Sequence, residues 1–131
     1  MKVRGVRGAI TASANTRSHI LAATDKLLRE MVSQNGVLSE DIGAVFFTTT
    51  PDLTAEFPAA AARALGWSKV PLQCAQEMTV PERLPACVRV LMLVNTDAAQ
   101  SDIKHIYLDG AARLRPDLSG EEDLETAGTT F

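Results

Sequence analysis

The stretch Cys87-Val-Arg-Val-Leu-Met-Leu-Val94 is the most apolar segment of the chain and predicts a buried β-strand. Arg89 lies inside this segment, where a charged side chain is unusual. Burying an unpaired guanidinium costs several kcal/mol, so an anionic group should meet it. Glu77 is one candidate partner and an anionic ligand is another. The residues alone leave both alternatives open.

Four more strands are expected around this segment, over residues 2–10, 44–49, 70–74 and 102–108. In the first strand, alternation places Arg7 on the same face as Val3 and Ala9. Residues 76–85 are rich in turn formers, with Pro81 and Pro85.

Two helices are expected between the strands. Apolar residues recur at three- and four-residue spacings over residues 20–32 and form one stripe. Asn15 or Thr16 can cap the start of this helix, and Asn35-Gly36 supplies a left-handed stop. Pro58 suits the first turn of a second helix over residues 59–65, which Gly66 can end. Ser39 can cap a short turn through Ile42, and residues 114–118 read as a short extended piece.

The order of elements predicts an α+β (α/β) fold, a mixed β-sheet with two to three helices on one side. We expect one domain over residues 1–118 and a flexible C-terminal tail over residues 119–131, which carries acidic residues and little apolar bulk. Several strands read as buried on both faces, yet few helices are available to cover them. A partner subunit could cover the rest, so this mismatch favours an oligomer.

Composition excludes several classes of protein. The chain has 131 residues, of which 46% are hydrophobic and 22% charged, with a net charge of −3. This balance argues against a nucleic-acid or membrane-surface partner. The longest apolar run is too short to span a bilayer. Two cysteines and a start without the apolar core of a signal sequence indicate a cytoplasmic protein with free thiols.

No cofactor or metal is expected. His19 and His105 are isolated, so no Cys/His spacing suggests zinc. Gly5 and Gly8 do not form a dinucleotide fingerprint, and neither a phosphate loop nor a serine triad is present. Cys74 could act as a nucleophile only with a nearby base, and an inert thiol is the simpler interpretation.

Two strand arginines, Arg7 and Arg89, indicate an anion site, because guanidinium binds carboxylate through two parallel hydrogen bonds. The alternative is an internal ion pair without a ligand. Tyr107 is the only tyrosine, and its hydroxyl needs a partner, which a ligand carboxylate could be. Phe57 reads most simply as a staple or core residue, and Asp52 as a cap for the turn after Pro51.

Eight short segments together resemble the monofunctional chorismate mutases of the trimeric α/β-barrel class. They cover residues 1–118 in nearly the same order and spacing, and each is weak alone. The segments are Arg4-Gly-Val-Arg-Gly-Ala9, Thr50-Pro-Asp-Leu53, Phe57-Pro-Ala59, Val70-Pro-Leu-Gln-Cys-Ala-Gln-Glu-Met78, Arg89-Val90, Asn95-Thr-Asp97, Lys104-His-Ile-Tyr-Leu108 and Leu114-Arg-Pro-Asp-Leu118.

The resemblance implies a homotrimeric pseudo-α/β-barrel with a cleft at each subunit interface. It implies the Claisen rearrangement of chorismate to prephenate, in the branch of aromatic amino-acid biosynthesis that leads to phenylalanine and tyrosine. A pericyclic reaction of this kind needs no nucleophile, metal or cofactor.

The resemblance also implies roles for individual residues. Arg89 should donate to the ether oxygen of the breaking bond, and it then needs no permanent carboxylate partner. Glu77 should take the substrate hydroxyl, while Arg7 and Tyr107 should hold a carboxylate. The other cleft residues should be Gln73, Cys74 (beside Glu77), Ala75, Gln76, Phe57 near the ring, and Arg63 and Arg115 at the mouth. Ala60 stands where some relatives carry lysine, which puts cationic help from that position in doubt.

Two other hypotheses remain. A non-catalytic trimeric module could bind an anionic metabolite in the same cleft without converting it. A purely structural interaction domain would leave Arg7 and Arg89 unexplained.

Overall fold

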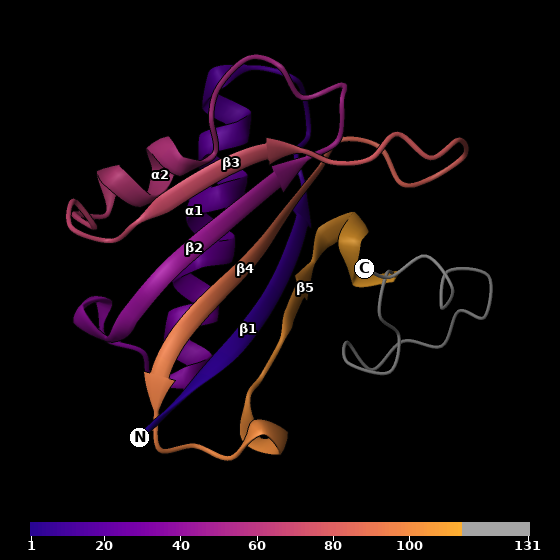
Figure 1. Cartoon of the computed structure of the whole chain (residues 1–131). Helices are drawn as coiled ribbons and strands as arrows, with labels where there is room; N and C mark the ends of the chain where they lie inside the picture. The colour runs from indigo at the N-terminus through magenta and orange to yellow at the C-terminus, as the bar shows by residue number, and fades with distance from the viewer. Residues whose placement is uncertain (114–131) are drawn as a thin grey trace.

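A five-stranded mixed sheet with the strand order β3-β2-β4-β1-β5 forms the body of the chain (Figure 1). The computed structural model describes residues 1–113. The strands are β1 (Lys2–Thr11), β2 (Ile42–Thr49), β3 (Leu72–Gln76), β4 (Cys87–Thr96) and β5 (Ile106–Leu108), and the α-helices are α1 (Arg17–Asn35) and α2 (Ala59–Ala64). Short 3₁₀ turns cover Ser39–Asp41, Gln100–Asp102 and Asp109–Arg113. The predicted mixed sheet is confirmed. The predicted piece 114–118, the tail 119–131 and Arg115 lie outside the described residues.

β4 is the central strand of the sheet. It pairs antiparallel with both β1 and β2, while β3 and β5 add parallel strands at the two edges. The face of β4 toward α1 is buried in the main core, which accounts for the apolar residues Val88, Val90, Met92 and Val94.

Helix α1 begins and ends where its sequence predicts. The His19 backbone N–H donates to the Thr16 side-chain oxygen (3.2 Å) at the N-cap, and Gly36 ends the helix with φ of +60°. The face of α1 that packs on the sheet is formed by its buried side chains, Ile20, Thr24, Leu27, Leu28 and Met31.

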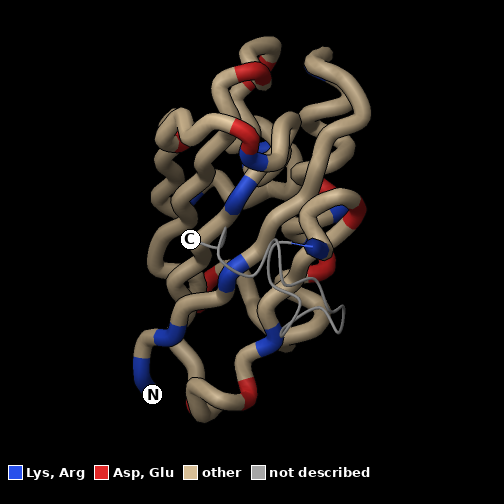
Figure 2. Tube along the Cα trace, turned by 90° about the vertical axis from the view of Figure 1, so that its right-hand side faces the viewer, with Lys and Arg blue, Asp and Glu red and all other residues tan. Residues whose placement is uncertain are grey.

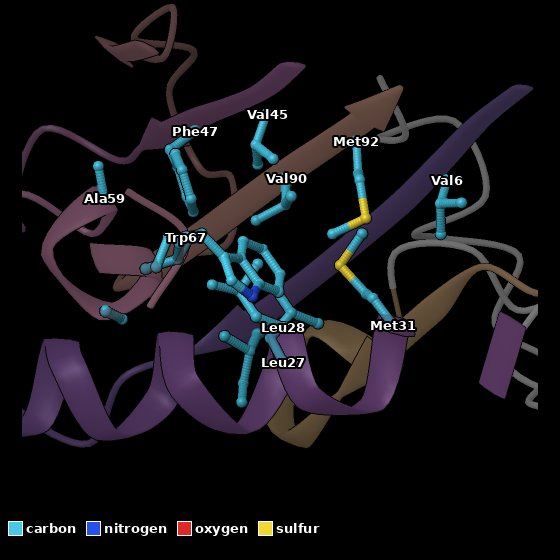
Figure 3. Packing of buried hydrophobic residues seen from close by; sticks show 14 of the residues in the cluster. Val6, Leu27, Leu28, Met31, Val45, Phe47, Ala59, Trp67, Val90 and Met92 are labelled. Atoms are coloured by element: carbon cyan, nitrogen blue, oxygen red, sulfur yellow. The ribbon is translucent and has the colours of Figure 1, made fainter. Parts of the chain in front are cut away.

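The main core lies between α1 and one face of the sheet. Figure 3 shows Met31 of α1 and Met92 of β4 pointing toward one another, with Trp67, Leu27 and Leu28 grouped beside them. The strand residues on this face are alternate positions, as expected for a pleated sheet packed on one side: Val6, Ile10, Val45, Phe47, Val88, Val90, Met92 and Val94.

The opposite face of the sheet has no helix on it in the described chain, and we call it the open face. In Figure 1 it is turned toward the viewer, with α1 behind the sheet. Val3, Phe46 and Leu91 are 59%, 37% and 36% exposed on this face. The expectation that several strands are buried on both faces is therefore wrong for β2 within one chain, because nothing in residues 1–113 covers Phe46.

Two strand starts and one turn cap depart most from the predictions. Strand β3 begins at Leu72 rather than Val70, because the turn after α2 continues to Val70, whose N–H donates to the Trp67 carbonyl (3.2 Å). Strand β5 covers only Ile106–Leu108. Residues before it are held instead by the Asn35 side chain, which accepts from the Lys104 N–H and donates to its carbonyl, both at 2.8 Å.

The third difference concerns the turn at Ser39–Asp41. Leu38 occupies the capping position, and no side chain caps the turn. The predicted capping role of Ser39 is therefore wrong.

Candidate active site

One row of residues crosses the open face at the level of Arg89. Backbone pairing places Ala75 in β3 beside Thr48 in β2, then Arg89 in β4, Ala9 in β1 and Tyr107 in β5. Since neighbouring strands lie about 4.8 Å apart, the Cα atoms of Arg89 and Tyr107 are roughly 10 Å apart. The sheet thus brings residues from distant parts of the sequence to one level of the open face.

Arg89 forms an ion pair with Glu77. The Arg89 Nε atom lies 2.7 Å from Glu77 Oε1, and the Arg89 residue is only 6% exposed. Burial raises the pKa of Glu77 above the ordinary glutamate value, while the charge of Arg89 acts in the opposite direction. The expectation that Arg89 needs no carboxylate partner is thus wrong for the chain by itself. The first candidate partner, Glu77, is the one found.

Arg7 lies on the same face, in the neighbouring strand. It pairs with Leu91, two residues along β4 from Arg89, and it is half-buried. The Arg7 backbone N–H donates to His105 Nδ1 (3.0 Å), so an imidazole extends the contact between β1 and the segment entering β5. Sequence reasoning treated His105 as isolated and missed this contact. Its two-residue spacing from Tyr107 was the available signal.

Tyr107 and Cys87 are buried near the same end of the open face. They form a small cluster with Ala9 and Ala111, and Leu84 packs against it from the segment between β3 and β4. Burial raises the pKa of the Cys87 thiol to about 11, so this cysteine is a neutral packing residue at neutral pH.

A second group of predicted residues surrounds a cavity of about 320 Å³ near α2. Phe57 is 66% exposed at this cavity, so the interpretation of Phe57 as a core residue is wrong. The lining residues are Thr49, Leu53, Thr54, Ala55, Glu56, Phe57, Pro58, Cys74, Ala75 and Gln76.

Cys74 belongs to this second group and packs against the main core, opposite Phe47. Burial raises the pKa of its thiol, which argues against a thiolate nucleophile. Arg63 lies close enough to oppose that shift by its charge, and it is exposed at the end of α2.

The loop that carries Phe57 is fixed by polar contacts that sequence reasoning missed. Asn15 Oδ1 accepts from the backbone N–H groups of Thr54 (2.9 Å) and Ala55 (3.0 Å). Glu56 accepts from the Phe57 N–H (2.8 Å), which lowers the pKa of its carboxyl, and it pairs with Arg17 (2.9 Å). Only the polar character of Asn15, just before a helix, hinted at such a contact.

The two groups do not meet within one chain. Glu77 and Arg89 lie on the open face, whereas Cys74 lies on the α1 side of the sheet. The expected position of Cys74 beside Glu77 is therefore not found in the single chain. Gln73 is exposed and pairs with Phe46, on the open-face side.

Over residues 1–113, no three or more His, Cys, Asp and Glu side chains gather where they could share a metal ion. None of the helices in that range is both long and apolar enough to cross a membrane. Figure 2 shows residues of both charge signs distributed along the trace.

The family model for chorismate mutase type I matches residues 3–118. A chorismate mutase AroH from Thermus thermophilus is 50% identical over 121 residues, covering 92% of this chain and 99% of that relative. A chorismate mutase AroH from Bacillus subtilis (strain 168) is 44% identical over 126 residues, covering 95% and 99%. The solved structure of a chorismate mutase from Clostridium thermocellum is 51% identical and superposes with a TM-score of 0.81, covering 82% of this chain and 96% of that one.

The chain belongs to the type I chorismate mutase family. It is an isomerase, a chorismate mutase of the AroH class, as the resemblance in the sequence implied.

Proposed function

We propose that Arg89, Glu77, Arg7 and Tyr107 hold chorismate on the open face while it rearranges to prephenate. The observation that carries this proposal is the buried Arg89 in the central strand, with Tyr107 in the same row and Arg7 one step along the neighbouring strand. Chorismate is a dianion, and guanidinium groups on a partly water-excluded face suit its carboxylates.

Arg89 is assigned to the ether oxygen of the bond that breaks. Negative charge grows on this oxygen in the transition state, so a fixed donor there stabilises the transition state more than the substrate. Glu77 is assigned to the substrate hydroxyl, and it also fixes Arg89 through the 2.7 Å ion pair. Arg7 and Tyr107 bind carboxylate and hold the flexible substrate in its compact reactive conformation.

The rest of the cleft is assigned to a neighbouring subunit of a homotrimer. Within one chain Glu77 and Arg89 lie on the open face, whereas Cys74 in the lining of the cavity near α2 lies on the α1 side of the sheet, and we therefore assign these two groups to different halves of the cleft. Exposed Val3, Phe46 and Leu91 support a subunit contact on the open face. The cleft residues on the neighbouring side are Phe57, Arg63, Cys74 and Gln76, with Gln73 and Ala75 along β3 and Arg115 beyond the described residues.

The biological setting is the phenylalanine and tyrosine branch of aromatic amino-acid biosynthesis, in the cytoplasm. The two free cysteines, Cys74 and Cys87, support a reducing compartment. The domain is proposed to span residues 1–118.

The test has two measurements on the purified full-length chain. Chorismate is added with and without EDTA, and the loss of its ultraviolet absorbance is followed, with buffer as the blank. Turnover that EDTA does not change is expected. The mass in solution is measured by light scattering under the assay conditions, and a trimer is expected. Absence of turnover would contradict the chemistry, and a fully active monomer would contradict the shared cleft.

A further inference from the structure

The segment between β3 and β4 covers residues 77–86 and connects the two members of the ion pair. Glu77 is its first residue, and Arg89 lies in β4, two residues after Cys87. Both ends are tied to the end of β2: the Glu77 N–H donates to the Thr49 carbonyl (2.9 Å), and the Thr50 N–H donates to the Cys87 carbonyl (3.0 Å).

Two side chains after β2 strengthen the second tie. The Cys87 N–H donates to the Thr50 side-chain oxygen (3.0 Å), and the Ala86 N–H donates to Asp52 Oδ2 (2.9 Å). From the other side, the Ala12 N–H donates to the Ala86 carbonyl (2.8 Å). Ala86 is thus held at its amide by Asp52 and at its carbonyl by the chain after β1.

Ala86 has a left-handed backbone, with φ of +54°. This conformation is unfavourable for a residue with a Cβ atom and persists where the surroundings enforce it. Asp52 is the side chain that receives the Ala86 N–H in this conformation. The Thr50 side chain and the backbone N–H groups of Asp52 and Ala86 lower the pKa of the Asp52 carboxyl, consistent with an ionised acceptor at neutral pH.

We propose that Asp52 is a positioning residue for Arg89. Its carboxylate keeps Ala86 left-handed and so sets the direction in which Cys87 enters β4, two residues before the guanidinium at the reacting bond. Without it, Ala86 relaxes to negative φ, and Arg89 is displaced from the ether oxygen. This inference rests on the role proposed for Arg89, and it gives the Thr50-Pro-Asp segment a function beyond capping its own turn.

The experiment compares four variants of the full-length trimeric enzyme in the chorismate assay. Asp52→Ala should lower kcat about 10-fold or more with little change in KM, because small misplacements of a catalytic group are costly. Asp52→Asn keeps an oxygen acceptor and should retain most of kcat. Asp97→Ala is the matched control, since this aspartate is exposed just after the other end of β4 and pairs with the N-terminal amino group. It should leave kcat unchanged.

The fourth variant tests the backbone step. Glycine adopts positive φ without penalty, so Ala86→Gly added to Asp52→Ala should restore a large part of kcat. A purely structural role for Asp52 predicts no such recovery. The proposal is overturned if Asp52→Ala matches Asp97→Ala, or if kcat is lost but glycine at position 86 restores nothing.

Amide hydrogen exchange separates this inference from the proposed function. The Ala86 and Cys87 amides should exchange faster in Asp52→Ala than in the parent chain, whether or not Arg89 has the assigned role. Unchanged exchange rates would overturn the proposed role of Asp52 in holding Ala86, even in a variant with low activity. If Asp52→Ala does not fold, Asp52→Ser, which shortens the acceptor, takes its place in every comparison. Normal kcat in Arg89→Lys would contradict the proposed role of Arg89. The exchange result would still decide whether Asp52 holds Ala86.

Discussion

Cys74 and Glu77 are three residues apart in the sequence and lie on opposite sides of the sheet. Cys74 pairs with Phe47 and packs on the main core, whereas Glu77 reaches Arg89 on the open face. In the proposed trimer, each chain contributes one half of a cleft on each of these two sides. This separation is the structural basis for the first prediction.

Two inactive variants should restore activity when they are mixed. Arg89→Ala removes the open-face half, and the double variant Phe57→Ala/Arg63→Ala impairs the cavity half. Unfolding and refolding the two together should give mixed trimers in which about one quarter of the interfaces combine two intact halves. The measurement is chorismate turnover after refolding the mixture, compared with each variant refolded alone. No gain on mixing would show that each cleft comes from a single chain.

Arg89→Lys should lower kcat by about 10²- to 10³-fold, by analogy with the loss of one preorganised donor. Lysine keeps the charge but loses the planar pair of donors and the Nε contact with Glu77. KM should change modestly, because the proposed carboxylate contacts of Arg7 and Tyr107 are left in place. Steady-state kinetics at saturating chorismate check this. A kcat near that of the parent enzyme would remove Arg89 from its assigned role.

Acid should inactivate the enzyme through Glu77. Burial raises the pKa of this carboxyl above 4.5, the ordinary value, so Glu77 gains its proton at a higher pH than an exposed glutamate. The charged form pairs with Arg89 and is the form proposed to accept the substrate hydroxyl, so kcat/KM should fall as the pH is lowered through this raised pKa. The profile of Glu77→Gln, recorded at its own lower rate, should lack that acid limb. An unchanged limb would assign the titration to another group.

Gly8→Ala should destabilise the fold by about 1–3 kcal/mol through overpacking. A Cβ atom at Gly8 would lie 2.5 Å from Met31 Sδ and 3.1 Å from Leu27 Cδ1. Gly43→Ala is the control, because its Cβ would meet nothing closer than the Leu93 carbonyl oxygen at 3.7 Å. Urea unfolding measures both free energies. Equal stabilities would mean that α1 moves away from β1 at no cost.

Cys74→Ser should change kcat only slightly. Burial raises the pKa of the Cys74 thiol, and the reaction proposed here forms no bond to the protein. A thiol reagent at pH 8 should label Cys74 slowly, and Cys87, with a pKa of about 11 and full burial, only after unfolding. Loss of all activity in Cys74→Ser would revive the nucleophile interpretation.

The local patterns predicted most of the fold. The stripe of α1, its Thr16 cap and Gly36 stop, and the apolar run of β4 each depend on nearby residues, and each is confirmed. The failed start of β5 depends on a distant contact. Residues just before β5 are held by the Asn35 side chain, which lies 69 positions away in the sequence.

The Arg89–Glu77 pair was predictable in its members but not in its arrangement. An arginine in an apolar strand identified Arg89, and Glu77 was named as its partner. Whether they meet depends on how residues 77–86 fold back, which no local pattern encodes. The odd spacing of Cys74 and Glu77 did indicate opposite faces of a strand, although the resemblance placed them together.

The buried pair of Arg89 and Glu77 also has a consequence for how this enzyme tolerates change. Removing two charges from water is expensive, and replacing a buried ion pair by well-packed apolar residues is often neutral or stabilising. A well-packed apolar replacement of both residues is therefore expected to leave the fold intact. In the roles proposed for Arg89 and Glu77, the two charges serve turnover rather than stability.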